Sequence, residues 1–266
     1  MEKIISINNL SIAFNKHTDV VKNVNIDVVK GKTTAIVGES GSGKTLSALS
    51  ILKLLPNGAN IKTGEITYNN KNLLNLSQKE IQNIRGNKIS TIFQEPMTSL
   101  NPLHTVNKQI EEIITTHNIL SKKEAKRRTI KLLNEVGLSD ISSRPKIYPY
   151  ELSGGQRQRA MIAMSIANEP DLLIADEPTT ALDVTIQLQI LELLQNIQKK
   201  MGMSMVFISH DLSVVKKLSD YIYVMKNGKV IEFGTKEKIF NNPQHEYTKE
   251  LVSNQSNIKE NSNQKS

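Results

Sequence analysis

The stretch GESGSGKT, which runs from Gly38 to Thr45, decides the fold class of this 266-residue chain. It matches the pattern G-x-x-x-x-G-K-[ST], in which glycines let backbone N–H groups wrap around a phosphate. The apolar run TTAIVG precedes it, and KTLSALSILKLL follows with helical spacing. A strand, a glycine-rich loop and a helix in this order predict a phosphate-binding loop on an α/β core.

Individual loop residues have separate predicted roles. Lys44 would reach the β- and γ-phosphates of a nucleotide, and the Thr45 hydroxyl would ligate Mg²⁺. The cradle itself comprises Gly38, Glu39, Ser40, Gly41, Ser42 and Gly43. Hydrolases, kinases and ATP-driven machines all carry such loops, so this stretch alone leaves its use open.

Two acids end a second apolar run, LLIADE. Asp176 closes the predicted strand, where an acid of a phosphate-loop enzyme holds Mg²⁺ through its water shell. Glu177 beside it could polarise an attacking water as general base. Because two acids at a strand end also occur in ordinary surface turns, this interpretation depends on the glycine loop.

The segment LSGGQRQR, Leu152 to Arg159, discriminates between these classes. Ser153, Gly154 and Gly155 open a predicted helix, so the chain has a second anion-binding helix start. Kinases and small GTPases have no need for one. It makes sense as a γ-phosphate sensor that serves the nucleotide of a neighbouring subunit.

Strand-like and helix-like segments alternate along the rest of the chain. KIISINNLSIAF alternates apolar and polar residues as a strand does, and MSMVFISH and the hairpin YIYVMKNGKVIEFG add further strands. That hairpin turns at Asn227 and Gly228. Residues 77–160 are rich in helical spacing instead. The pattern predicts an α/β domain with a mainly parallel core sheet and a helix-rich insertion.

Composition excludes several classes of protein. The chain has no cysteine, which excludes disulfides, thiolate zinc sites and iron–sulfur clusters in this polypeptide. No apolar run is long enough to span a bilayer and the N-terminus lacks a signal-peptide pattern, so we expect a cytoplasmic chain. The net charge of +8 fits nucleic acid, an anionic surface or a lysine-rich exterior, and the dispersed basic residues favour the last.

Together these motifs resemble the ATPases of the ATP-binding cassette (ABC) family over nearly the whole chain. The phosphate loop corresponds to Walker A, LSGGQ to the signature and LLIADE to Walker B. Gln94 in TIFQEP matches the Q-loop glutamine, and His210 in ISHD the switch histidine. ALD, Ala181 to Asp183, matches the D-loop. Phe14, 24 positions before Gly38, lies where family members place an adenine-stacking aromatic.

The resemblance implies an ABC cassette, which is an α/β P-loop NTPase fold with a RecA-like core. An N-terminal antiparallel β subdomain and an inserted α-helical signature subdomain complete it. The nucleotide-binding domain is expected at residues 1–250, with the helical subdomain at about 97–165. Residues 251–266 are polar, and we expect a disordered tail there.

The resemblance also implies a mechanism that uses ATP and Mg²⁺. Two cassettes close head to tail, and each ATP lies between the loop of one and the signature of the other. Glu177 positions water, His210 contacts the γ-phosphate, and Gln94 senses the metal and the transporter. Metal ligands are expected at Thr45, Gln94 and Asp176. Nucleotide contacts beyond the loop are expected at Phe14, Asp183, Ser153, Gly154, Gly155 and Gln156.

EPMTSLNP and IFNNPQHEYTKEL resemble, more narrowly, the ATPases of oligopeptide, dipeptide and nickel importers, and the phosphate-loop region resembles their D-type subunit. One set of motifs implies pairing with a copy of the chain or a related subunit, here an F-type partner. The other implied partners are two transmembrane permease subunits and, indirectly, an extracytoplasmic solute-binding protein. The chain would lie peripherally at the cytoplasmic face of the cell membrane.

Other functions stay open at this point. Many peptide-system members continue into a cysteine motif for an iron–sulfur cluster, which this chain lacks, so nickel or metallophore import remains an alternative. A DNA-repair or chromosome ATPase would share the motifs and suit the charge. Such proteins usually carry long coiled coils or zinc modules, so we expect no nucleic-acid partner. An exporter would usually be fused to membrane helices or lack EPMTSLNP.

Overall fold

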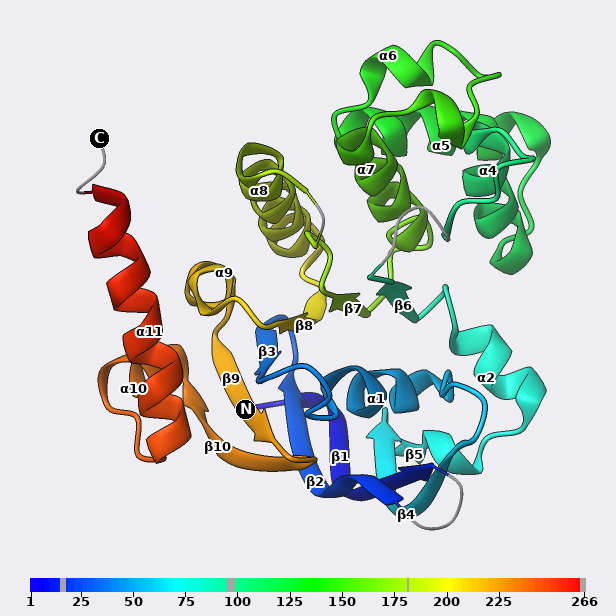
Figure 1. The fold of residues 1–266 in the computed structure, drawn as a ribbon. Helices are drawn as coiled ribbons and strands as arrows, with labels where there is room; N and C mark the ends of the chain where they lie inside the picture. Colours follow the sequence, from blue (N-terminus) through cyan, green and yellow to red (C-terminus); the bar gives the residue numbers. More distant parts are fainter. Residues whose placement is uncertain (15–17, 95–98, 181, 264–266) are drawn as a thin grey trace. The chain divides into compact units, whose positions relative to one another are not determined.

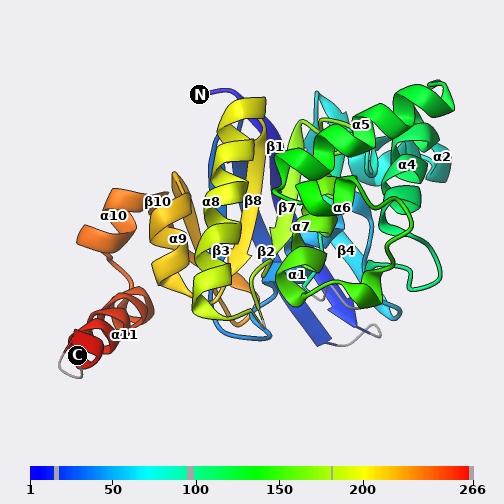
Figure 2. The same cartoon turned by 90° about the horizontal axis from the view of Figure 1, so that it is seen from above.

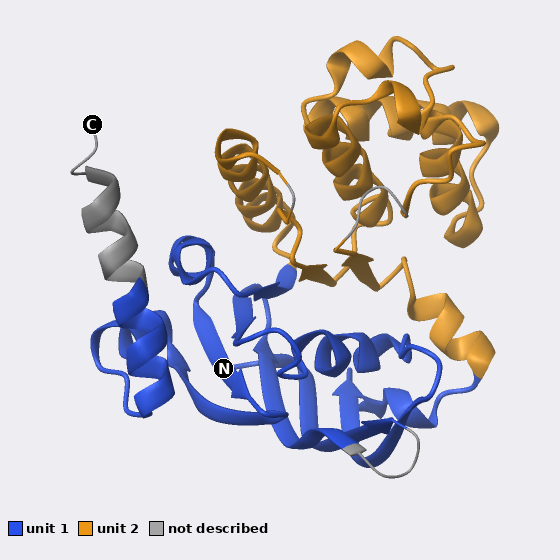
Figure 3. Cartoon of the chain, in the orientation of Figure 1, with its two compact units in different colours: residues 1–77, 204–266 blue, residues 78–203 orange. Residues whose placement is uncertain are grey.

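The computed structural model describes residues 1–14, 18–94, 99–180 and 182–263, with the side chains of these residues through 254 except that of Thr18. The chain divides into two compact units (Figure 3). Unit 1 comprises residues 1–77 and 204–266, and unit 2 comprises residues 78–203. Each unit is described by itself.

An antiparallel sheet in the order β2-β1-β4-β5 forms the N-terminal part of unit 1 (Figure 1). Its strands are β1 (Lys3–Phe14), β2 (Thr18–Val29), β4 (Ala59–Tyr68) and β5 (Lys71–Asn72). Ile5 and Ile7 of β1 are buried, and the run from Leu10 to Ala13 is buried without interruption, so both faces of this strand are covered in part. Asn69 and Asn70, which connect β4 to β5, both have positive φ, as a tight turn requires. The predicted antiparallel β subdomain is therefore present.

The second group of strands in unit 1 has the order β10-β9-β3-β8. It consists of β3 (Thr33–Val37), β8 (Ser204–Ser209), β9 (Tyr221–Lys226) and β10 (Lys229–Thr235). β3 runs parallel to both β8 and β9, and β9 and β10 form the predicted antiparallel hairpin. Its turn has φ of 49° at Asn227 and 79° at Gly228, as a tight hairpin turn requires. Every residue of β3 is buried, which suits a central parallel strand.

Helices of unit 1 connect and cover these strands. α9 packs over β3 and β8 (Figure 2), and α11 contacts α9. The bounds are α1 (Lys44–Leu49), η1 (Ser50–Leu52), η2 (Leu73–Asn75), α9 (Leu212–Leu218), α10 (Lys236–Asn241) and α11 (Glu246–Asn263). α11 thus carries a helix past residue 250, where the sequence predicts a disordered tail. The predicted domain boundaries themselves stay a prediction.

Unit 2 combines two short parallel strands with a group of helices. Its bounds are α2 (Gln78–Ile84), β6 (Ile89–Ile92), α4 (Val106–His117), α5 (Lys122–Glu135), α6 (Ser139–Ser142), η3 (Pro149–Glu151), α7 (Gly154–Ser165), β7 (Leu172–Asp176) and α8 (Val184–Met201). α4, α5 and α7 pack against one another, and α7 also contacts α8 and β6. The helix-rich insertion is therefore real, but β6 was not predicted within it.

Local capping explains where the helices of unit 2 begin and end. Ser121 forms a capping box with Glu124 at the start of α5, which satisfies N–H groups that the helix leaves unpaired. Gly137, with φ of 76°, follows the C-cap of α5 in the left-handed conformation that commonly ends a helix. Within the described part of the chain, we find no helix both long and apolar enough to cross a bilayer.

Candidate functional site

The glycine-rich loop after β3 has a backbone that only glycine adopts readily. Gly38, Gly41 and Gly43 have φ of 149°, 77° and 96°. A side chain at Gly38 would also collide with the carbonyl oxygen of Met225 at the end of β9. The loop therefore needs glycine at these positions both for its conformation and for its close approach to the sheet.

Lys44 lies inside the loop rather than on its surface. The residue is only 5% exposed, and its Nζ donates to the carbonyl oxygens of Gly38, at 2.9 Å, and Glu39, at 2.8 Å. Burying an ammonium group is costly unless it is hydrogen-bonded, and the loop carbonyls accept two hydrogen bonds from it here. The cation is thus held at the centre of the curved backbone.

Ser42 supplies a direct test of whether the loop fits a polar ligand. Its residue is 4% exposed, and its Oγ has no hydrogen-bond partner among the described residues. A buried hydroxyl without a partner is uncommon and calls for a ligand or water. With the ammonium of Lys44 in the same loop, the residues present fit a bound phosphate.

The other predicted site residues of unit 1 lie at strand ends and at the start of α1. Phe14 is half-buried at the end of β1, opposite Ala59 of β4. Thr45 is half-buried in the first turn of α1, and Ser40 is exposed. His210 is exposed directly after β8.

Hydrogen bonds on both sides fix the backbone around His210. The N–H of Asp211 donates to Ser209 Oγ at 3.0 Å. Asp211 Oδ1 in turn caps α9, since it accepts from the N–H of Ser213 at 2.7 Å. The histidine is therefore held between a strand end and a capped helix start.

In unit 2, the structure brings together two residues that the sequence separates by 83 positions. Gln94 Nε2 donates to Glu177 Oε2 at 3.2 Å. Thr180 Oγ1 donates to the same carboxylate oxygen at 3.0 Å. Asp176, 3% exposed, ends β7 immediately before Glu177, and Glu177 has a positive φ of 45°. A non-glycine residue in this region is uncommon, and here it aims the carboxylate toward Gln94.

Sequence reasoning missed Thr180. Its hydroxyl fixes Glu177 from the following turn, and the neighbouring Thr179 accepts from Gln187 Nε2 of α8 at 3.2 Å. The one sequence feature that could have predicted this contact is DEPTT, residues 176–180. A threonine three positions after a glutamate can reach back to it over one turn.

The signature segment is a regular capped helix start. Ser153 is the N-cap of α7, with its Oγ accepting from Gln156 N–H at 3.3 Å and its own N–H donating to Gln156 Oε1 at 3.0 Å. Ser153 and Gly154 are exposed, and Gly155 and Gln156 are half-buried. An added Cβ on Gly155 would lie 2.9 Å from Ile186 Cγ2 of α8, so packing requires glycine there.

Two further predicted motifs lie partly outside the described residues. Of the D-loop ALD, Ala181 lies outside them, and Asp183 is the N-cap of α8, accepting from Ile186 N–H at 3.0 Å. Of EPMTSLNP, residues 95–98 lie outside. The part that follows is held by Gln109 of α4, whose Oε1 accepts from Asn101 N–H at 2.8 Å.

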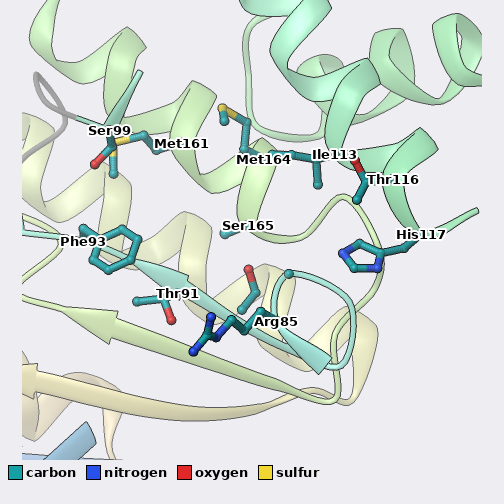
Figure 4. A pocket seen from close by; sticks show the side chains of 12 residues that line it. Arg85, Thr91, Phe93, Ser99, Ile113, Thr116, His117, Met161, Met164 and Ser165 are labelled. Carbon is teal, nitrogen blue, oxygen red and sulfur yellow. The ribbon is translucent and has the colours of Figure 1, made fainter. Parts of the chain in front are cut away.

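A cavity of about 370 Å³ opens within unit 2 between β6, α4 and α7 (Figure 4). Its apolar lining includes Phe93, Ile113, Met161 and Met164, and His117 of α4 also lines it. Phe93, which directly precedes Gln94, is 42% exposed although it is aromatic. Exposed aromatic surface beside a concave, mostly apolar site is typical of binding surfaces.

Comparison with known proteins gives this geometry a family. Residues 21–180 match the family described as ABC transporter. The chain is 50% identical to the dipeptide transport ATP-binding protein DppD of Bacillus subtilis (strain 168), over 95% of this chain and 76% of DppD. It is 48% identical to the oligopeptide transport ATP-binding protein OppD of the same organism, over 92% of this chain and 70% of OppD.

A further relative is longer. The peptidoglycan transport ATP-binding protein YejF of Agrobacterium fabrum (strain C58 / ATCC 33970) is 52% identical over 94% of this chain, which spans 47% of YejF. This chain therefore corresponds to about half the length of that protein.

Among solved structures, the dimeric post-hydrolysis state of the ATP-binding cassette MJ0796, bound to ADP and Pi, is similar, with a TM-score of 0.76 and 29% identity. The similarity covers 87% of this chain and 98% of that one. Clostridium perfringens cbiO1, part of the ABC transporter complex cbiONQ, has a TM-score of 0.79 and 28% identity, covering 91% and 92%.

A phosphate loop with a buried lysine and a glutamate after a buried aspartate define a P-loop ATPase. The chain belongs to the ABC transporter family and is an ATP-hydrolysing cassette of it.

Proposed function

We propose that this chain is the ATP-hydrolysing subunit that energises an importer of oligopeptides or dipeptides. The observation that carries the proposal is the enclosed loop of unit 1, with Lys44 buried at its centre and Ser42 Oγ lacking a partner among the described residues. Transport of peptides is inferred from DppD and OppD, whose sequences are 50% and 48% identical to this chain.

ATP would be held by the loop from Gly38 to Thr45, with Phe14 against its adenine. Mg²⁺ would be held by oxygen atoms, which it prefers: the Thr45 hydroxyl and the carboxylate of Asp176. Gln94 would add its side-chain carbonyl oxygen, because its Nε2 already donates to Glu177. The ion would neutralise charge on the phosphates during transfer.

Glu177 is proposed as the general base that accepts a proton from the attacking water. Hydrogen bonds from Gln94 and Thr180 orient the carboxylate before the nucleotide binds, so less reorganisation is needed during reaction. His210 is proposed to contact the γ-phosphate. A change at Gln94 would reach Glu177 directly, which gives the glutamine a route for coupling transport to hydrolysis.

A second ABC ATPase subunit is proposed as the partner, an F-type chain by resemblance. The exposed Ser153 and Gly154 at the start of α7 support this, because an accessible helix N-terminus can bind the phosphate of another subunit. Gly155, Gln156 and Asp183 would belong to the same interface. With two permease subunits and a solute-binding protein, the complex would place this chain at the cytoplasmic face of the cell membrane.

The cavity of unit 2 is proposed to receive a segment of a permease subunit. Methionines adapt their shape to an inserted apolar surface, and Phe93 links that surface to Gln94 in the chain. Met164→Glu should lower co-purification of this chain with the permease subunits about tenfold, since it buries a charge in the contact. Ile119→Glu, at a fully exposed position of the same unit that does not line the cavity, should not. Equal effects would refute this docking site.

Uptake in a strain lacking the gene tests the cargo. Complementation with this chain should restore uptake of labelled dipeptides or oligopeptides, with peptidoglycan-derived peptides as a further arm. Restoration of Ni²⁺ uptake alone would instead support the nickel or metallophore alternative. Restoration of none of these would contradict the proposed importer.

A further inference from the structure

The C-terminal segment of unit 1 reaches the phosphate-binding loop. The backbone N–H of Glu39, the second loop residue, donates to the hydroxyl of Tyr247 at 3.1 Å, although 208 positions separate them. Tyr247 lies in the first turn of α11 and is only 4% exposed. None of the family motifs described above includes a tyrosine that contacts the loop.

This contact completes a clamp on one peptide unit of the loop. The peptide that joins Gly38 to Glu39 is planar, so its C=O and N–H point in opposite directions. Its carbonyl oxygen accepts from Lys44 Nζ at 2.9 Å, and its N–H donates to Tyr247. Rotation of this peptide would break both bonds together, so Tyr247 restrains the carbonyl that holds Lys44.

Lys226 and His245 contact Tyr247 itself, and Glu232 fixes the segment before it. Lys226 Nζ, at the end of β9, lies 4.1 Å from the centre of its ring, a cation–π contact. The carboxylate of Glu232 on β10 accepts from the N–H groups of Gln244, at 2.7 Å, and His245, at 3.0 Å. His245 Nδ1 accepts from Tyr247 N–H at 3.1 Å. The segment before α11 is therefore anchored to the β9–β10 hairpin, and the tyrosine is rigidly presented.

The surroundings of Tyr247 keep its hydroxyl protonated. Burial raises the pKa of Tyr247, and the charge of the Glu39 carboxylate raises it further. A protonated hydroxyl accepts from the Glu39 N–H and keeps its own proton. Tyr247 is therefore a neutral hydrogen-bond partner of the loop.

We infer that Tyr247 is a positioning residue for the phosphate-binding loop, acting through the Gly38–Glu39 peptide on Lys44. The inference rests on the proposed role of the loop in holding ATP. Tyr247 touches no phosphate in this account. It keeps the loop in the conformation that places the Lys44 ammonium at the centre of the cradle.

Tyr247→Phe is the direct test, because it keeps the ring, its burial and the contact with Lys226 and removes only the hydroxyl. Loss of this hydrogen bonding should weaken ATP and ADP binding about three- to tenfold. In the hydrolysis assay KM should rise by the same factor while kcat changes less than about twofold, because uniform binding is lost. A role in fold stability alone would shift the melting temperature and leave both constants unchanged.

Tyr221→Phe is the matched control. Tyr221 also lies in unit 1, on β9, and its hydroxyl contacts Met1 Sδ rather than the loop. It should bind ATP as the unaltered chain does.

A double-mutant cycle tests the route through Glu39. Glu39→Pro deletes the N–H that Tyr247 accepts, so adding Tyr247→Phe to it should cost little more ATP affinity. Unchanged ATP affinity and KM in Tyr247→Phe, or additive effects in the cycle, would overturn the inference.

Lys44→Ala separates this failure from failure of the proposed function. If Lys44→Ala loses ATP binding and Tyr247→Phe does not, only the role of Tyr247 is wrong. If Lys44→Ala binds ATP normally, the proposed function of the loop fails.

Discussion

Two glycine-rich segments of this molecule, the phosphate-binding loop and the signature, use glycine for different reasons. In the loop, Gly38, Gly41 and Gly43 have positive φ, so the backbone itself demands glycine. In the signature, Gly154 and Gly155 lie in the first turn of α7 and are absent from the positive-φ residues. There, Gly155 is required by contact with Ile186.

These two backbone conformations determine how each segment can bind a phosphate. The loop curls around a buried lysine and forms a cradle within unit 1. The signature is an exposed, regular helix start whose serine is engaged in its own capping box. The loop is thus built to enclose an anion, whereas the signature is built to present a helix terminus to one. Such an arrangement suits an ATP site shared between subunits.

The largest expected effect is at Glu177, the proposed general base, which lies outside both glycine-rich segments. Glu177→Gln should lower kcat for ATP hydrolysis about 10²- to 10⁴-fold, because an amide does not accept the proton of water. ATP should still bind, and the closed dimer should accumulate in size-exclusion chromatography. Glu169→Gln, at an exposed ion pair with Arg128, is the control. Undiminished turnover in Glu177→Gln would refute the assignment.

The second-largest expected effect is on ATP binding, through Lys44 at the centre of the loop. Lys44→Ala should weaken ATP binding about 100-fold, because charge-assisted hydrogen bonds to the phosphates are lost. Calorimetric titration measures it. Lys62→Ala removes a lysine of the same unit that pairs with Asp19 on the surface, and should leave affinity unchanged. Equal affinities for the two variants would mean that the loop does not hold the nucleotide.

The smallest expected effect is a difference in stability between glycine substitutions in the loop and in the signature. Gly43→Ala should lower the free energy of unfolding by about 1–3 kcal/mol, since alanine is strained at φ of 96°. Gly154→Ala should change it by less than about 0.5 kcal/mol, because the nearest atom to an added Cβ is 3.7 Å away. Urea denaturation measures both. Similar losses would show that the two segments do not differ as described.

Local patterns were enough to predict much of this fold. The strand at residues 3–14 and the turn at Asn227 and Gly228 depend on neighbours in sequence, and the structure confirms both. β6 was missed because a strand of Ile89–Ile92 is too short to show periodicity inside a helix-rich region. Strand pairing supplies what the local sequence lacks, since β6 pairs with β7.

The residues of the candidate site also differ in how far the sequence alone could predict them. Motif spacing identified the loop and the acids, because those residues are adjacent in sequence. The contact of Gln94 with Glu177 and that of Tyr247 with Glu39 join residues far apart in the chain. Only the folded backbone brings them together, and a tyrosine in HEYT gives no local sign of its partner.

In the proposed complex, this chain supplies its signature to an ATP site whose phosphate loop belongs to the partner subunit. The most direct measurement places Ser153→Arg in this chain within the assembled transporter and follows vanadate-trapped, photo-crosslinked azido-ATP on each subunit. If the site is shared in this way, trapping is lost from the partner subunit and retained on this chain. Loss from this chain alone, with the partner subunit labelled normally, would contradict it.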